Sequence, residues 1–334
     1  MSDQEIDRMR EILQDGFGRR VDYLRISVTD RCNLRCFYCM PKGGVPFLPS
    51  SQILRYEEIL KLADLFLELG VKKIRITGGE PLVRKNILFL LQELGKRKSL
   101  EELVLTTNGT KLHELAYGLL EAGVKRVNVS LDTLIPFTFL KITGIDLHGR
   151  VMRGISEAAS LGLKIKVNVV AMRGVNDQEL QDFVRYGIDK EVDICFIEIM
   201  PHAYNSGVAR DLFIPRREIF KRIKAIFPLF KTGEAHRRLT ADVYGVKGSE
   251  ITLGFISALS HPFCERCNRV RLTPDGRLKT CLFGEKDLDL RALIQSQTEE
   301  DLIKKEICLA VRAKPAKHNL KDEWGNLAMH RVGG

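Results

Sequence analysis

Long apolar stretches are missing from this sequence. No apolar run approaches the ~20 residues that a membrane-spanning helix requires, because Lys, Arg or Glu interrupts the longest candidates. The segment from Met1 to Gln14 is charged and lacks the apolar core of a signal peptide. These absences predict a cytoplasmic protein with no membrane partner.

Cysteine is present and unevenly distributed. Six of the eight cysteines fall into two groups, Cys32, Cys36 and Cys39 and then Cys264, Cys267 and Cys281. In a reducing compartment, grouped cysteines indicate metal ligands or catalytic groups more than disulfides. The remaining two, Cys195 and Cys308, lie in apolar stretches, so we expect them to pack in the core.

The charge balance is basic. Lys and Arg number 53 against 43 Asp and Glu, which gives a formal net charge of +10. Such a balance suits a nucleic acid, an anionic membrane or a polyanionic small substrate, and composition alone does not choose among them.

Short β-like runs alternate with amphipathic helical patterns between residues 22 and 203. Glycines stand where these helices would end, at Gly70, Gly123 and Gly162. The alternation predicts an α/β fold with a parallel sheet, and six units favour a partial, open (βα)6 barrel of the TIM type over the full eight. The strands are expected at Tyr23–Thr29, Lys73–Thr77, Leu103–Thr107, Arg126–Asp132, Lys164–Ala171 and Asp193–Met200, and the helices at Tyr56–Leu69, Asn86–Arg97, Lys111–Ala122, Val151–Leu161 and Asp177–Asp189.

Polar and apolar residues alternate within these strands, although parallel strands in packed α/β cores are usually apolar on both faces. If helices cover the apolar face, the polar face lines the barrel interior. Arg25, Arg75 and Lys166 would lie there, which predicts a cavity for an anion. A sheet with one solvated face is the alternative.

The chain changes character after about residue 203. A basic helix at Pro215–Phe227 and a β-rich stretch at Glu250–Ser257 precede the second cysteine group. We therefore expect an N-terminal extension at 1–21, a partial barrel at 22–203 and a C-terminal domain at 204–334 that carries the second group.

The first cysteine group follows the first expected strand, at the edge where barrel enzymes build active sites. Three thiolates can hold three irons of a 4Fe–4S cube and leave the fourth iron open to a small chelating molecule. A zinc site is the alternative, but it would want a fourth ligand, and none lies nearby. The motif Gly78-Gly79-Glu80-Pro81 ends the second expected strand.

Together, the CxxxCxxC motif with Tyr38 before its last cysteine and the Gly78–Pro81 motif resemble radical S-adenosylmethionine (SAM) enzymes. The resemblance implies a 4Fe–4S cluster on Cys32, Cys36 and Cys39 that cleaves SAM. It also implies that Gly78, Gly79, Glu80 and Pro81 bind the methionyl amino group of that cofactor.

The second group, Cys264, Cys267 and Cys281, again supplies three thiolates without an obvious fourth ligand. Two incomplete trios suggest two clusters, the second with an iron open to substrate. Arg269 and Arg271 lie between the ligands, well placed for a phosphate or a purine edge. A zinc knuckle with a distant ligand such as His261, or a solvated basic loop, stays open here.

The segment CxxCNRxRxTxxGxxxxC and the Gly333-Gly334 end resemble the GTP 3′,8-cyclases of molybdenum-cofactor biosynthesis, along essentially the whole chain. The resemblance implies two 4Fe–4S clusters, with GTP between them inside a partial barrel. It assigns the GTP contacts to Arg25, Arg75, Thr106, Lys166 and the segment Arg269, Val270, Arg271, and the other SAM contacts to Tyr38, Ser130 and Met200. Catalytic roles fall on Arg25, Arg269, Arg271, Gly333 and Gly334.

The same resemblance implies a low-potential electron donor and a downstream cyclic pyranopterin synthase as partners, with a homodimer left open. Two other functions are weighed against it. A radical SAM maturase that modifies a peptide would usually hold more C-terminal cysteines than this chain. A zinc-bearing nucleic-acid-binding protein would need a basic stripe interleaved with aromatics, which is missing.

Overall fold

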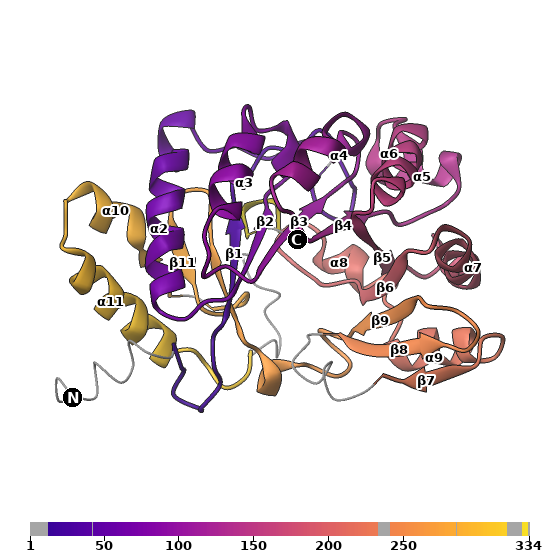
Figure 1. Ribbon diagram of the computed structural model, residues 1–334. Coiled ribbons are helices and arrows are strands. Elements are labelled where there is room, and N and C mark those ends of the chain that lie inside the picture. The colour runs from indigo at the N-terminus through magenta and orange to yellow at the C-terminus, as the bar shows by residue number, and fades with distance from the viewer. Residues whose placement is uncertain (1–12, 42, 233–240, 285, 319–328, 333–334) are drawn as a thin grey trace.

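The computed structural model describes residues 13–41, 43–232, 241–284, 286–318 and 329–332. These residues form one mixed sheet of twelve strands, in the order β12-β11-β10-β1-β2-β3-β4-β5-β6-β9-β8-β7. Helices lie against its outer face, and the strands curve around an interior (Figure 1). Among the described strands no pairing joins β12 to β7, so the sheet is open.

The six expected strands are confirmed and lie side by side in chain order. They are parallel to one another throughout. This confirms the predicted α/β class and its parallel sheet. The strands are β1 (Tyr23–Ser27), β2 (Lys73–Thr77), β3 (Glu102–Thr107), β4 (Arg126–Ser130), β5 (Lys164–Ala171) and β6 (Asp193–Glu198).

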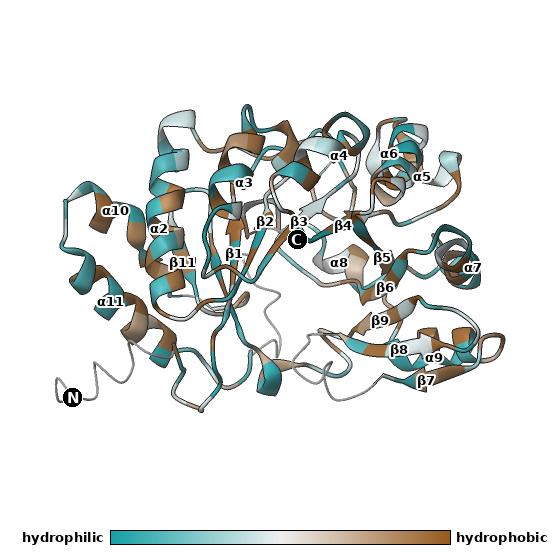
Figure 2. Cartoon of the chain, viewed as in Figure 1, coloured by the Kyte–Doolittle hydropathy of each residue, from teal (hydrophilic) through white to brown (hydrophobic). Residues whose placement is uncertain are grey.

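Helices connect these strands and cover one face of the sheet. In α2 (Tyr56–Glu68) hydrophobic and hydrophilic residues alternate along the helix (Figure 2), and its buried side is mainly hydrophobic. The expected helices correspond to α2 (Tyr56–Glu68), α3 (Ile87–Gly95), α4 (Leu112–Glu121), α6 (His148–Ser160) and α7 (Leu180–Lys190), and η2 (Pro81–Val83) and α5 (Pro136–Thr143) were not expected. Gly70, Gly123 and Gly162 end helices with positive φ, as predicted.

The main hydrophobic core lies between the sheet and these helices. Ile26 on β1 and Ile76 on β2 are fully buried there, together with Leu62 and Phe66 of α2. Because side chains alternate across a strand, this packing turns Arg25 and Arg75 to the opposite, interior face. The polar face of the strands therefore lines the inside of the sheet, as predicted.

The chain beyond residue 203 extends both edges of the same sheet. Strand β9 (Thr252–Ile256) pairs with β6, and β10 (Arg269–Leu272) pairs with β1, both in parallel. Antiparallel strands complete each edge: β8 (Asp242–Val246) and β7 (Leu229–Lys231) on one side, β11 (Arg277–Lys279) and β12 (Leu288–Asp289) on the other. One sheet thus contains strands from both sides of the expected boundary at 203, and the division into domains stays a prediction.

Several short helices accompany these edge strands. The expected helix at Pro215–Phe227 is α9 (Arg216–Lys224). The others were not expected: η1 (Ser50–Gln52), α8 (Ser206–Asp211), η4 (Cys264–Arg266), α10 (Leu290–Gln295), α11 (Glu300–Arg312) and α12 (Met329–Val332).

Strand register aligns cations across three neighbouring strands. Arg25 on β1 has Arg75 of β2 as its partner on one side and Arg271 of β10 on the other. Two residues earlier, Tyr23 lies in the same way between Lys73 and Arg269. Two adjacent rows of basic residues therefore cross the interior face.

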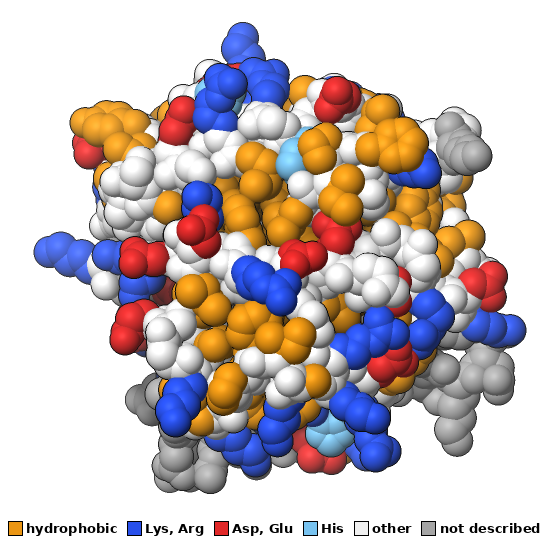
Figure 3. All heavy atoms as spheres, turned by 90° about the vertical axis from the view of Figure 1, so that its right-hand side faces the viewer, with side chains coloured by type: hydrophobic (Ala, Val, Ile, Leu, Met, Phe, Trp, Pro, Cys, Tyr) orange, Lys and Arg blue, Asp and Glu red, His pale blue; other side chains and the backbone are white. Residues whose placement is uncertain are grey.

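No helix among the described residues is long and apolar enough to cross a bilayer. On the face shown in Figure 3, hydrophobic side chains lie in separate patches with charged side chains between them.

Candidate active site

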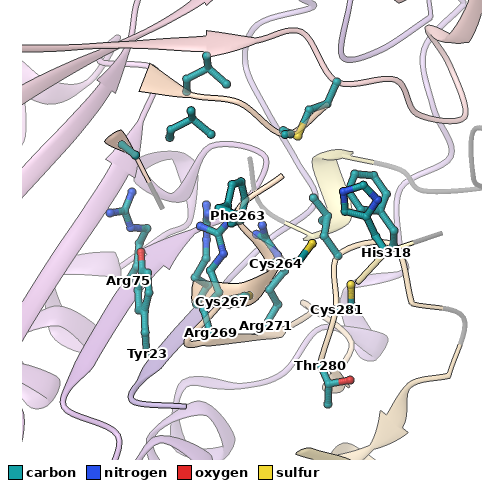
Figure 4. A pocket seen from close by; sticks show the side chains of 18 of the residues that line it. Tyr23, Arg75, Phe263, Cys264, Cys267, Arg269, Arg271, Thr280, Cys281 and His318 are labelled. Atoms are coloured by element: carbon teal, nitrogen blue, oxygen red, sulfur yellow. The ribbon is translucent and has the colours of Figure 1, made fainter. Parts of the chain in front are cut away.

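The interior of the sheet holds a cavity with an empty volume of about 1450 Å³, open solvent at its mouth included. Basic side chains from five strands line it, and the second cysteine trio lies at one end (Figure 4). The basic residues on those strands are Arg25, Lys73, Arg75, Arg126, Lys166, Arg269 and Arg271. A concave site with this lining is suited to a polyanion.

Most of the predicted substrate residues meet in this cavity. Lys166 lines it, whereas Lys164 is exposed at the start of β5. Thr106 lies behind the wall, where its hydroxyl oxygen accepts a hydrogen bond from Nη1 of Arg75 at 3.0 Å. Val270 packs in the core with its side chain away from the cavity, so only its backbone faces a ligand.

Crowding of buried cations changes their protonation equilibria. Burial, then the charge of Arg271, holds the pKa of Arg25 well below its usual range. Burial and Arg269 lower the pKa of Arg271 to about 9. Both shifts have burial as their first cause and a neighbouring arginine as their second, so a bound polyanion would favour the charged forms.

The second trio lies in this basic surrounding. Burial raises the pKa of the Cys267 thiol, but the charges of Lys314 and Arg269 outweigh it and bring that pKa down to about 7. Nζ of Lys314 is 3.4 Å from Sγ of Cys267. A thiolate, the form that binds iron, is therefore favoured at Cys267.

The C-terminal end of the chain approaches the same place. Nη1 of Arg271 donates to the carbonyl oxygen of Val332 at 3.4 Å, and Met329 lines the cavity. The predicted catalytic residues Gly333 and Gly334 follow directly but lie outside the described residues.

The first trio lies on the loop after β1, beside the loop after β2. The backbone N–H of Gly79 donates to the carbonyl of Thr29 at 2.7 Å, and that of Glu80 donates to Arg31 at 2.8 Å. Cys32, Cys36 and Cys39 are half-buried free thiols. Burial is the main cause that raises their pKa, to about 11 for Cys32 and about 12 for Cys39.

Both trios thus offer three free thiols each, the donor set that 4Fe–4S clusters use. Within the described parts of the chain, no three His, Cys, Asp or Glu residues are drawn together closely enough to hold a single metal ion.

Glu80 ties the second loop to the end of β3. Its fully buried carboxylate accepts hydrogen bonds from the backbone of Leu82 at 2.9 Å, the hydroxyl of Thr107 at 2.7 Å and the backbone of Asn108 at 2.5 Å. Burial outweighs these bonds and raises the pKa of Glu80 to about 7. Three of the about four acceptor directions of this carboxylate are thus occupied by the protein itself.

Gly78 and Gly79 are required by the protein backbone itself. A Cβ on Gly78 would lie 2.7 Å from the carbonyl oxygen of Thr29, and one on Gly79 would overlap the carbonyl of Arg31. The glycines let the two loops touch, which places Glu80 and Pro81 beside the cysteine loop.

Tyr38 links the first trio to the cavity. Its hydroxyl donates to the carboxylate of Asp132 at 2.6 Å, and its carbonyl accepts from Nδ2 of Asn205 at 2.8 Å. The same Nδ2 also donates to the carbonyl of Met200 at 3.1 Å, and Met200 lines the cavity. Ser130 ends β4 on the interior face, half-buried. Two of the predicted SAM contacts, Tyr38 and Met200, are thus joined through Asn205, and Met200 lies on the cavity wall.

Comparison with known proteins gives this arrangement a family. The sequence matches the Radical SAM superfamily over residues 26–187 and Molybdenum Cofactor Synthesis C over residues 192–320. A GTP 3′,8-cyclase of Peptoclostridium acidaminophilum is 43% identical over 97% of this chain and 99% of its own. The chain belongs to the GTP 3′,8-cyclase family. A mitochondrial GTP 3′,8-cyclase of Arabidopsis thaliana is 42% identical over 97% of this chain and 84% of its own.

Membership in the GTP 3′,8-cyclase family confirms the predicted resemblance and implies a 4Fe–4S cluster and SAM as cofactors. Among solved structures, Streptococcus suis SuiB has a TM-score of 0.63 at 13% identity, over 93% of this chain and 70% of that one. SuiB bound to SAM has a TM-score of 0.61 at 14% identity, with the same coverage of both chains. This likeness shows a shared fold.

Sequence reasoning missed several residues of the GTP 3′,8-cyclase site. Tyr23 and Lys73 stand two positions before Arg25 and Arg75, so the same alternation could have found them. Arg126 and Asp132 lie on the polar face of the fourth expected strand, so the alternation could have found them as well. Lys314 gave no such signal, because its contacts are with residues far from it along the chain. Cys195 is buried as predicted, but it lies on the cavity wall.

The Gly79 contact predicts that Gly79→Ala disturbs the first cysteine loop. The added methyl group must push Arg31 away, which costs about 1–3 kcal/mol. We expect a lower melting temperature and less iron bound after anaerobic reconstitution. Gly149→Ala, on α6 with nothing within 4 Å of the added Cβ, is the control. Equal melting temperatures and iron contents for the two variants would contradict the conclusion that Gly79 is required for the contact with the first cysteine loop.

Proposed function

We propose that this chain is a GTP 3′,8-cyclase. It converts GTP to (8S)-3′,8-cyclo-7,8-dihydroguanosine 5′-triphosphate, the first step of molybdenum-cofactor biosynthesis, in a SAM-dependent radical reaction. One observation supports it above the others: a cation-lined cavity contains the second cysteine trio and meets the first trio's surroundings at Met200. The family relationship supports the same activity.

Two 4Fe–4S clusters belong to the proposal, one on Cys32, Cys36 and Cys39 and one on Cys264, Cys267 and Cys281. With SAM bound and one electron supplied, a 4Fe–4S cluster on the first trio would provide the radical chemistry that replaces the 3′ hydrogen of GTP by a bond from C3′ to C8. One further electron and one proton would complete the dihydroguanosine product, and a cluster on the second trio would hold the guanine. Tyr38, Gly78, Gly79, Glu80, Pro81, Ser130 and Met200 hold SAM.

The chain binds and orients the triphosphate. Arg25 and Arg75 can each make paired hydrogen bonds to phosphate oxygens from a rigid fork. Lys166 adds a point charge from the opposite wall, and Thr106 fixes Arg75 through its hydroxyl. These contacts fix where the ribose lies, and a reactive radical must meet one hydrogen and no other.

Arg269 and Arg271 are the residues that act at the guanine end of GTP. They enter the cavity from β10, between the ligands of the second trio and next to Arg25. In this position they orient the base and assist proton delivery to it. Gly333 and Gly334 complete the proposed catalytic set, since Val332 already contacts Arg271.

The proposal also includes the surroundings of the reaction. A low-potential donor provides the electron, and cyclic pyranopterin synthase consumes the product. We also propose a cytoplasmic location and no nucleic-acid partner, and we leave a homodimer open. The proposed division of the chain is 1–21, 22–203 and 204–334.

A peptide-modifying maturase is the second candidate. One structure of SuiB is bound to the precursor peptide SuiA and shares the fold at a TM-score of 0.62 and 15% identity. The basic cavity favours a nucleotide instead, because a peptide offers no phosphate to seven lining cations of β1, β2, β4, β5 and β10.

Anaerobic reconstitution tests the proposal directly. With dithionite, SAM and GTP, we expect roughly eight irons per chain, as two four-iron clusters require, and a cyclised nucleotide detected by mass spectrometry. Binding of zinc in place of iron, or the absence of GTP-dependent turnover, would refute the proposal.

Lys166→Met is expected to weaken GTP binding about 10- to 100-fold, because a charged hydrogen bond contributes about 1.5–3 kcal/mol. Calorimetric titration of the reconstituted protein measures this. Lys164→Met is the matched control: Lys164 is exposed two residues earlier on the same strand face and should leave the affinity unchanged. Equal affinities of the two variants would refute the assignment of Lys166.

Cys264→Ala separates the two trios. We expect SAM cleavage without cyclisation, since the first trio stays complete while the guanine loses its anchor. Release of 5′-deoxyadenosine and of cyclised nucleotide are measured side by side. Cys308→Ala, which removes a buried thiol of α11, is the control and should retain cyclisation. Loss of SAM cleavage in Cys264→Ala would contradict a separate role for the second trio.

A further inference from the structure

A buried lysine beside the second trio has no role in the proposed reaction so far. Lys314 is 2% exposed and follows the end of α11. The buried face of that helix, with Ile303, Ile307 and Val311 fully enclosed, fixes its end against the sheet. Its hydrogen-bond partners among the described residues include no carboxylate, and a lysine is seldom buried so completely in that way unless its charge is used.

All three protons of the Lys314 ammonium are used. Nζ lies 2.6 Å from the carbonyl oxygen of Thr280, 2.7 Å from that of Arg269 and 3.4 Å from Sγ of Cys267. An ammonium has three donors, so none is left for a phosphate, although Lys314 lines the same cavity. Its contacts instead join the segment after Cys267 to the residue before Cys281.

Backbone contacts hold Lys314 in place independently of any cofactor. Its own N–H donates to the carbonyl of Val311 at 3.0 Å. The guanidinium of Arg19 donates to the carbonyls of Pro315 at 2.6 Å and Ala316 at 2.9 Å, and also to that of Cys264 at 2.6 Å. Through Arg19, the segment that carries Lys314 is therefore also linked to Cys264, the remaining ligand of the second trio.

We propose that Lys314 is a positioning residue of the second cluster. It holds the two ligand-bearing segments together, and its charge, placed at a ligand sulfur, favours the reduced state of the cluster. Hydrogen bonds to the sulfurs and local charge are known determinants of the reduction potential of such clusters. The inference rests on the proposed function, since it requires an iron–sulfur cluster at the second trio.

Lys314→Met tests the charge while keeping the apolar stem of the side chain. Lys305→Met, on the exposed side of α11, is the matched control. Both reconstituted variants are analysed for iron and by a redox titration followed by electron paramagnetic resonance. We expect the midpoint potential of the second cluster to move to a more negative value in Lys314→Met only. A second cluster with an unchanged midpoint in that variant would overturn the proposal.

Lys314→Arg keeps the inference testable if Lys314→Met loses the second cluster. Because arginine retains the charge, Lys314→Arg should restore the second cluster and a midpoint potential nearer that of the unaltered chain. If Lys314→Arg also lacks the second cluster, the proposed role of the charge is contradicted. If the unaltered chain itself binds only one cluster, the proposed function fails. In that case the melting temperatures of the iron-free variants test whether Lys314 holds the two ligand-bearing segments together. Lys314→Met should have a lower melting temperature than Lys305→Met, and equal melting temperatures would refute this role.

Discussion

The arrangement depends on arginines placed in register on adjacent parallel strands. Arg271, Arg25 and Arg75 stand side by side across β10, β1 and β2. Strands lie about 4.8 Å apart, and two like charges at that distance repel by about 3 kcal/mol at an effective dielectric constant of 20. An apolar interior would avoid this repulsion. A polyanion bound between them, as in the proposed function, would offset this repulsion.

The two cysteine trios lie in electrostatically opposite surroundings. Around the first, burial together with Glu80 raises the pKa of Cys32, and Asp132 lies close by. Around the second, Lys314 and Arg269 bring the pKa of Cys267 to about 7. A sulfonium such as SAM suits the first environment, and an anionic nucleotide suits the second. The proposed positions of SAM and GTP thus agree with the charge around each trio.

Sequence periodicity was sufficient for the strands β1 to β6, because alternation of side chains is a local property. It also identified Arg25, Arg75 and Lys166, which share a face for the same reason. Strand β10 was not predicted: its four residues lie between cysteines, and its pairing with β1 joins segments about 245 residues apart. The role of Lys314 was not predicted for a related reason, since its acceptors at Arg269 and Thr280 become neighbours only after the sheet has formed.

The attachment of late strands to both edges of the sheet has a consequence for biosynthesis. While the ribosome is still making the last third of the chain, β1 and β6 have no outer neighbours and present unpaired peptide groups. Such edges are prone to pair with other chains. The nascent protein therefore depends on β9 and β10, made after the six barrel strands, to cover both of these edges.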